Sequence, residues 1–172
     1  MNIIPHNNHL DKAEAFLTKA TPTGIDAVIV SDPGVFHLVR SSFPELSIHI
    51  STQANTTNYG SVQFWHERGA SRVVLARELS LKEIGVIKSR SPENMELEAF
   101  VHGAMCISYS GRCLLSNYLA RRDSNMGDCA HPCRWKYHLV EEKRPNEYYP
   151  VEENENGTFI FNSKDLCMIQ YV

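Results

Sequence analysis

Cysteine is the residue whose type and spacing in this sequence could do chemistry. The chain has five cysteines among 172 residues, all of them after position 105. An odd number of thiols, in a chain whose first residues carry no export signal, is poor support for disulfide bonds. In a reducing compartment, clustered thiols more often bind metal or act as nucleophiles. The five are Cys106, Cys113, Cys129, Cys133 and Cys167.

Metal binding accounts for more of these thiols than any other chemistry. Four thiolates suit either zinc or an iron–sulfur cluster. Structural zinc sites usually have two closely spaced C-x₂₋₄-C ligand pairs, and only Cys129 and Cys133 have that spacing. Six residues separate Cys106 from Cys113. Because the irons of a cluster spread its sulfur ligands farther apart than one zinc ion does, the wide spacing favours a cluster, with zinc as the alternative.

A thiol protease is the competing interpretation. Its nucleophile would need a histidine partner and a third group that orients the histidine. His102, His131 and His138 are available, but the chain contains no G-x-S-x-G, H-E-x-x-H or papain-type segment. A single nucleophile would also leave the other four cysteines without a role, so hydrolysis by cysteine stays a second interpretation.

Short apolar runs alternate with helical patterns along the first hundred residues. The runs begin 21 to 25 positions apart, and most are rich in β-branched or aromatic residues. This alternation predicts βαβ units and a parallel sheet. The expected strands are 2–7, 26–32, 47–53, 72–78 and 96–103, and the expected helices are 10–20, 33–43, 58–70 and 80–90. Ser80 with Glu83 predicts a capping box, and Gly69 predicts a helix C-terminus.

Polar residues at the ends of these runs favour a (β/α) barrel over a doubly wound dinucleotide fold. A barrel builds its active site at the carboxyl ends of its strands, and no G-x-G-x-x-G follows the first run. Glu98 is expected to be buried mid-strand and to need a partner. The candidate pocket residues at the strand ends are His6, Asp32, Gln53, Arg77, Glu98 and His102.

The chain is too short for a complete barrel, which takes about 250 residues. We therefore expect an α/β fragment of a longer protein. Its parts are a partial barrel over 1–116, a cysteine-containing rim insertion over 117–163, and a return to the barrel over 164–172. Short antiparallel strands are expected in the insertion at 136–142, 147–153 and 157–163, the last two joined by a turn at 154–157.

Composition excludes some function classes. With 42% apolar and 22% charged residues and a formal charge of −3, the chain is not a general polyanion binder. No run approaches the roughly 18 apolar residues of a membrane span. The N-terminal residues do not resemble a secretion signal, so we expect a cytoplasmic protein without a membrane partner.

One local cluster has the composition of a surface that grips single-stranded RNA loops, because guanidinium groups bind phosphates and aromatic rings stack on unpaired bases. The alternative is a solvated rim on which the tryptophan packs. The residues of this cluster are Arg121, Arg122, Arg134, Trp135 and Lys136.

The stretch E-A-F-V-H-G-A-M-C-I-S-Y-S-G-R-C-L-L-S, residues 98–116, resembles the signature of the collagenase-like peptidase family of unassigned catalytic type. The similarity extends along nearly the whole chain, through V-I-V-S-D-P-G-V-F, H-I-S-T-Q-A-N and F-I-F-N-S-K-D-L-C. The chain is most similar to the family's tRNA hydroxylation branch, which makes 5-hydroxyuridine at the wobble position using prephenate. A sister branch acts in oxygen-independent ubiquinone hydroxylation.

The resemblance implies a barrel and, in the hydroxylating branches, a [4Fe–4S] cluster. The implied ligands are Cys106, Cys113, Cys129 and Cys167, with Cys133 spare; exchange of Cys133 for Cys167 stays open. The implied partners are tRNA and prephenate, and Arg77 is a candidate to grip a prephenate carboxylate. A collagenase-like protease and a zinc-stabilised RNA-binding module remain the alternatives. The residues predict no oligomeric state.

Overall fold

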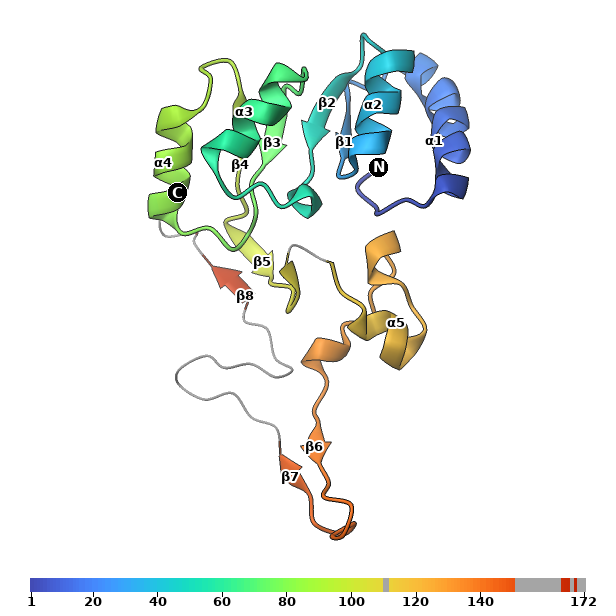
Figure 1. Ribbon diagram of the computed structural model, residues 1–172, viewed down its shortest axis with the longest axis vertical. Helices are drawn as coiled ribbons and strands as arrows, with labels where there is room; N and C mark the ends of the chain where they lie inside the picture. Colours follow the sequence, from blue (N-terminus) through green and yellow to red (C-terminus); the bar gives the residue numbers. More distant parts are fainter. Residues whose placement is uncertain (110–111, 151–164, 168, 170–172) are drawn as a thin grey trace. The chain divides into compact units, whose positions relative to one another are not determined.

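The computed structural model describes residues 1–109, 112–150, 165–167 and 169 (Figure 1). The chain forms two compact units, Met1–Phe100 and Val101–Val172. The expected α/β class is confirmed, because the first unit alternates strands and helices and the second contains short antiparallel strand pairs. The expected boundaries at residues 116 and 163 stay predictions.

The first unit is built on a four-stranded parallel sheet in which the strand order follows the chain order (Figure 1). Its strands are β1 (Ala27–Val30), β2 (Ser47–Ile50), β3 (Arg72–Val74) and β4 (Glu96–Glu98). Its helices are α1 (Asn7–Ala20), α2 (Pro33–Ser42), α3 (Tyr59–Glu67) and α4 (Leu81–Arg90). Because parallel crossovers are right-handed, successive connections in one direction place their helices on one face of the sheet. That is the winding of a (β/α) barrel, whereas a doubly wound sheet reverses its strand order.

The core lies between the sheet and this helical layer. Alternate strand residues such as Val30, Ile48 and Val73 pack there against helix residues such as Val39 and Val62. The opposite face of the sheet is more polar. It carries Ile29, His49, Arg72, Glu96 and Glu98, all partly or largely exposed. In a closed barrel this second face would point to the interior.

Local signals set the helix ends. The Ser80 hydroxyl accepts from the Glu83 N–H at 3.3 Å, and the Glu83 carboxylate accepts from the Ser80 N–H at 2.8 Å, which confirms the capping box. The Ser80 hydroxyl also donates to the Glu83 carboxylate at 2.7 Å, and this bond, followed by the one from the Ser80 N–H, lowers the pKa of Glu83. Gly69 follows α3 with φ +92°, as expected for a residue just beyond a helix.

Two expected strands differ from the structure. Residues 2–7 form no strand: residues 1–6 are irregular and α1 begins at Asn7. Pro5 has no N–H to give to a ladder, and the Ile3 carbonyl accepts from the Ser31 hydroxyl instead. The expected strand 96–103 is split. Its first part is β4, and its last residues belong to β5 (His102–Ala104), in the second unit.

The second unit contains α5 (Leu115–Ala120) and two antiparallel strand pairs. Strand β5 pairs with β8 (Asp165–Cys167), and β6 (His138–Leu139) pairs with β7 (Tyr149–Pro150) (Figure 1). The strands expected within 136–142 and 147–153 are therefore confirmed. The strand expected at 157–163 and the turn at 154–157 lie outside the described residues. The described residues also form the short 3₁₀ turns η1 (Thr21–Thr23), η2 (Thr52–Ala54), η4 (Ser124–Met126) and η5 (Pro132–Arg134).

No helix in the described part of the chain combines the length and the apolar character that a membrane crossing requires.

Candidate functional site

Cys113 is held in place through both its backbone and its sulfur. Its N–H donates to Asn125 Oδ1 at 3.2 Å, and its carbonyl accepts from Ser124 Oγ at 2.6 Å and from Asn125 Nδ2 at 3.3 Å. Its Sγ accepts the N–H of Leu115 at 3.3 Å. The residue is 7% exposed. This thiol is therefore preset in a buried turn before α5.

Cys129 has the same kind of sulfur contact. Its Sγ accepts the N–H of His131 at 3.3 Å. The next residue, Ala130, donates its N–H to the hydroxyl of the fully buried Ser116 at 3.0 Å. Because Ser116 is in the first turn of α5, this bond ties the Cys129 loop to the helix that follows Cys113.

Arg122 lies against the same loop. Its Nε and Nη2 contact Asp128 Oδ1 at 2.8 Å and 2.7 Å. The hydrogen bond and charge of Asp128, together with the charge of a Cys129 thiolate, raise the pKa of Arg122. The ion pair therefore ties the segment after α5 to the residue that precedes Cys129.

The other three cysteines lie in or near β5, η5 and β8. Cys106 is half-buried and follows β5 by two residues. Cys133 is buried in η5, where burial and the charge of Cys133 raise the pKa of Tyr137. The backbone of Cys167 lies in β8, opposite His102 of β5. The pairing of β8 with β5 therefore brings the chain back to the strand that leads into Cys106.

The donor set fits a thiolate-ligated iron–sulfur cluster by its chemistry. Backbone N–H groups that point at sulfur stabilise thiolates and tune clusters, and Cys113 and Cys129 each have one. Among the described residues, no three Cys, His, Asp or Glu side chains come together as a metal site. The side chain of Cys167 lies outside that description, so the four-cysteine set stays a prediction.

The strand ends of the first unit carry a second group of expected site residues. Asp32 follows β1 and caps α2, its Oδ1 accepting from Val35 N–H at 3.0 Å. Gln53 lies in η2, directly after β2. The Oε1 of Gln53, Oδ1 of Asn55 and Oγ1 of Thr56 are buried without a partner in the described part of the chain. Unsatisfied buried polar atoms are rare in folded proteins and mark this loop as a site candidate.

Arg77 follows the last residue of β3, Val74, by three positions, and Glu98 is the last residue of β4. The Arg77 guanidinium is 5.3 Å from the ring centroid of Phe100, and it has a further partner. Glu98 was expected to be buried, and this is wrong: its side chain is 54% exposed and lies 3.5 Å from an Arg72 nitrogen. The reason is that Glu98 is on the face of the sheet that the helices do not cover.

The two histidines of the expected pocket belong to different parts of the chain. His6 is exposed and is the N-cap of α1, where its N–H donates to His9 Nδ1 at 2.9 Å. His102 is exposed at the start of β5 and belongs to the second unit. The structure thus groups Asp32, Gln53 and Arg77 at the carboxyl edge of one sheet, while His102 belongs with the cysteines.

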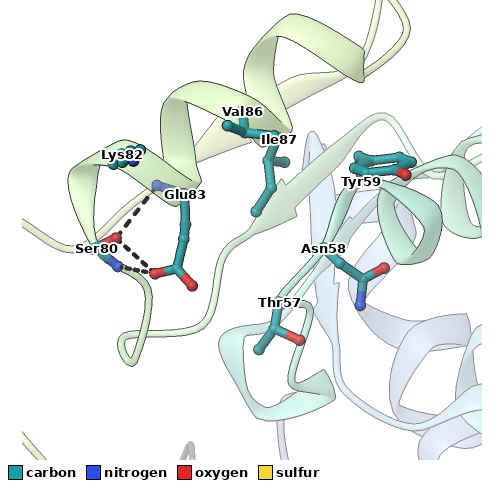
Figure 2. A pocket seen from close by; sticks show the side chains of 8 residues that line it. All are labelled: Thr57, Asn58, Tyr59, Ser80, Lys82, Glu83, Val86 and Ile87. Carbon is teal, nitrogen blue, oxygen red and sulfur yellow. Dashed lines mark hydrogen bonds between the residues drawn. The ribbon is translucent and has the colours of Figure 1, made fainter.

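An open cavity of about 590 Å³ lies between the N-terminal parts of α3 and α4 (Figure 2). Its apolar lining comes from Tyr59 of α3 and from Val86 and Ile87 of α4, and Arg90 lies 4.9 Å from the Tyr59 ring centroid. Thr57, Asn58, Ser80, Lys82 and Glu83 also line it. Nothing in the sequence predicted this cavity, because it depends on how two helices separated by β3 pack together.

The basic and aromatic residues expected to contact RNA all belong to the second unit. Trp135 is 48% exposed, between the exposed Arg134 and Lys136. Arg121 is exposed at the C-cap of α5, with φ 54°. Arg122 is engaged by Asp128, which reduces its availability for phosphate. Tyr118, 85% exposed on α5, is an aromatic candidate that sequence reasoning missed, because a helical pattern does not reveal an unpacked face.

Comparison with known proteins identifies the family. The model of peptidase family U32 matches residues 1–172. The chain belongs to this family. A solved structure of a U32 peptidase has a TM-score of 0.50 with this chain, at 17% identity, covering 86% of this chain and 57% of the other. At that identity the likeness supports the fold alone.

Curated relatives are more similar in sequence. The tRNA hydroxylation protein P of Escherichia coli is 42% identical over 100% of this chain and 46% of its own length. The tRNA hydroxylation protein P1 of Bacillus subtilis is 42% identical over 99% and 40%. An uncharacterized protease of Methanocaldococcus jannaschii is 41% identical over 99% and 41%. The chain therefore spans less than half the length of these relatives.

Proposed function

We propose that this U32 chain acts in hydroxylation of tRNA, converting the wobble uridine to 5-hydroxyuridine with prephenate as co-substrate. The observation that carries the proposal is the match of the entire chain, at 42% identity, to proteins named for tRNA hydroxylation. Support from the structure is that backbone N–H groups donate hydrogen bonds to the sulfurs of Cys113 and Cys129.

In this proposal Cys106, Cys113, Cys129 and Cys167 hold a [4Fe–4S] cluster, which when bound supplies one-electron chemistry. Cys113 and Cys129 are preset by their backbone contacts. Cys106 and Cys167 belong to segments joined by the β5–β8 pairing. In this proposal, metal binding is coupled to the folding of the segments that carry these four thiols.

The small co-substrate is proposed to bind at the carboxyl edge of the sheet. Arg77 is oriented by its contact with Phe100, and a planar guanidinium holds a carboxylate through two parallel hydrogen bonds. The buried, unpartnered oxygens of Gln53, Asn55 and Thr56 offer acceptors for hydroxyl groups at the same edge. Asp32 is assigned to holding the start of α2 in position.

The tRNA is proposed to contact the second unit. Arg134, Trp135 and Lys136 are consecutive and exposed, so they present two cations and a ring to a single-stranded loop. Arg121 adds a third cation. With a net charge of −3 for the chain, this contact is local. Action on tRNA fits the cytoplasmic location expected from the sequence.

The first test is the identity of the bound metal. The protein, purified without oxygen, is expected to be brown and to contain iron and sulfide in equal amounts. Replacing Cys106, Cys113, Cys129 or Cys167 by Ser should remove the iron, while Cys133→Ser should retain it. Loss of iron in Cys133→Ser with retention in Cys167→Ser would exchange these two assignments. Zinc in place of iron would favour a zinc-stabilised RNA-binding module.

The second test concerns the substrate. Tandem mass spectrometry of tRNA nucleosides, in cells with and without the gene, is expected to show loss of 5-hydroxyuridine and its return on complementation. An unchanged level contradicts the proposal.

A protease remains the competing function, because one relative is named an uncharacterized protease. The hydrogen bonds of the Cys113 and Cys129 sulfurs, however, come from backbone N–H groups and not from an imidazole. Gelatin cleavage that survives removal of all metal but is lost in Cys106→Ser would decide for the protease.

A further inference from the structure

Asn125 contacts Cys113 in a way that few side chains could reproduce. Its amide oxygen accepts the Cys113 N–H at 3.2 Å, and its amide nitrogen donates to the Cys113 carbonyl at 3.3 Å. Asparagine offers a donor and an acceptor from one end of a short side chain, whereas aspartate offers only acceptors when ionised. The two residues are twelve positions apart in the chain, so the contact closes a loop around α5.

Asn125 is itself fixed by the turn that carries it. Its N–H donates to Asp123 Oδ1 at 2.9 Å, and the Asp128 N–H donates to the Asp123 carbonyl at 3.0 Å. Gly127 closes the turn with φ +86°. The amide of Asn125 is therefore presented to Cys113 by a hydrogen-bonded turn that leads directly into Cys129.

The contact determines where the Cys113 sulfur lies. With the N–H and carbonyl of Cys113 both held, the orientation of its Cα–Cβ bond is fixed. The Sγ then lies 3.3 Å from the N–H of Leu115 in a buried site. Loss of the amide would leave the Cys113 N–H without its partner, and Ser124 alone would hold the carbonyl.

We infer that Asn125 is a positioning residue for the thiolate of Cys113, and that it presets one corner of the metal centre before metal arrives. The inference rests on the proposed iron–sulfur function and deepens it. Residues that support metal ligands typically change metal affinity by about 10- to 100-fold when replaced. Asn125 acts through Cys113 and needs no contact with the metal.

The test compares Asn125→Ala and Asn125→Asp with Asn117→Ala as a matched control. Asn117 is exposed on α5 and makes no side-chain hydrogen bond within the described residues. Iron release to a chelator from the anaerobically purified protein is expected to be about tenfold faster in Asn125→Ala and unchanged in Asn117→Ala. Equal release rates for wild type and Asn125→Ala would overturn the inference.

Asn125→Asp tests the reduction potential of the metal centre, which should not change if Asn125 has only a structural role. It keeps the acceptor for the Cys113 N–H, loses the donor and adds a negative charge next to the backbone of Cys113. Iron should therefore be retained better than in Asn125→Ala, while the reduction potential of the centre falls. An unchanged potential, measured by spectroelectrochemical titration, argues against the assignment. This variant also keeps the test open if Asn125→Ala does not fold.

A measurement on metal-free protein separates this inference from the proposed function. Iodoacetamide labelling resolved by mass spectrometry should modify Cys113 several-fold faster in Asn125→Ala than in wild type, with Cys106 as the internal reference. If wild type binds no iron, the proposed function fails, yet this difference still supports the positioning role. Equal labelling of Cys113 in both proteins refutes that role whatever the metal content.

Discussion

His49 and Arg72 occupy paired positions on β2 and β3, on the face of the sheet that the helices leave uncovered. Arg72 in turn makes hydrogen-bonded ion pairs with Glu96, its partner on β4, and lies near Glu98. A row of ionisable side chains thus crosses three strands. In a closed barrel such a row would lie inside, where each buried charge must be paired with a charge of opposite sign.

This row predicts a pH dependence of stability. Burial, and then the charge of Arg72, lower the pKa of His49, although Glu96 and Glu98 act in the opposite direction. The unfolded chain therefore binds a proton at a higher pH than the folded chain, and stability is lost as the pH falls below about 6.5. In urea unfolding between pH 7.5 and pH 5, roughly the range in which histidine titrates, His49→Gln should flatten this loss.

The control for that experiment is His37→Gln, on the exposed side of α2. It should leave the slope of stability against pH as it is in wild type. A slope that survives in His49→Gln, or disappears in His37→Gln, would show that the dependence comes from another group.

Gly69 and Gly85 predict opposite effects of the same substitution. Gly69 has φ +92°, and an added Cβ would lie 2.7 Å from an Arg40 nitrogen. Gly69→Ala should therefore lower the free energy of unfolding by at least about 1–2 kcal/mol, from the left-handed backbone alone. Gly85 is inside α4, where nothing lies within 4 Å of an added Cβ. Gly85→Ala should raise stability by roughly 0.5–1 kcal/mol. Thermal and urea unfolding measure both, and a loss of stability in both variants would contradict the helix geometry.

Local and periodic signals made much of the fold predictable. The spacing of the apolar runs located β1 to β4, and Ser80 with Glu83 located the start of α4, because these features depend on residues close in sequence. The strand predicted at residues 2–7 was wrong, because an apolar run that contains Pro5 can pack against the core without pairing with another strand. The break after Glu98 was not visible either, because strand pairing of His102 with Cys167 depends on a segment more than sixty residues away.

The candidate site was predictable to a smaller extent. Residue type alone singled out the cysteines, and strand ends singled out Gln53. Sequence could not indicate that Arg122 is bound by Asp128, that Glu98 is exposed, or that Asn125 holds Cys113, because each depends on how a loop folds back. Thr56 was missed for a different reason. Thr56 is a candidate because its buried hydroxyl has no hydrogen-bond partner among the described residues, and no pattern of residues predicts an unsatisfied hydroxyl.

Thr56 and Thr52 provide a test of the pocket at the end of β2. The Thr52 hydroxyl donates to the Leu75 carbonyl at 3.1 Å, whereas the Thr56 hydroxyl is buried without a partner in the described chain. Thr52→Val should lose about 1 kcal/mol of unfolding free energy. Thr56→Val should be neutral or stabilising, since it removes an unsatisfied polar group. If the site binds prephenate, Thr56→Val should nevertheless weaken that binding in calorimetric titration. Equal destabilisation of both variants, with unchanged affinity, would make Thr56 an ordinary core residue.

Trp135 and Lys136 predict two different effects on tRNA binding. Removing a ring that stacks on a base should weaken binding by about 1–3 kcal/mol at any salt concentration, which is the expectation for Trp135→Ala. Removing one phosphate contact should instead reduce the slope of log affinity against log salt by about 1, as expected for Lys136→Ala. The control is Arg68→Ala: Arg68 is an exposed cation on the first unit, 3.6 Å from the Phe64 ring centroid. Filter binding from about 50 to 200 mM salt separates these effects. If Arg68→Ala reduces the slope as much as Lys136→Ala, the charge contact is diffuse, and the exposed run at residues 134–136 is a solvated rim.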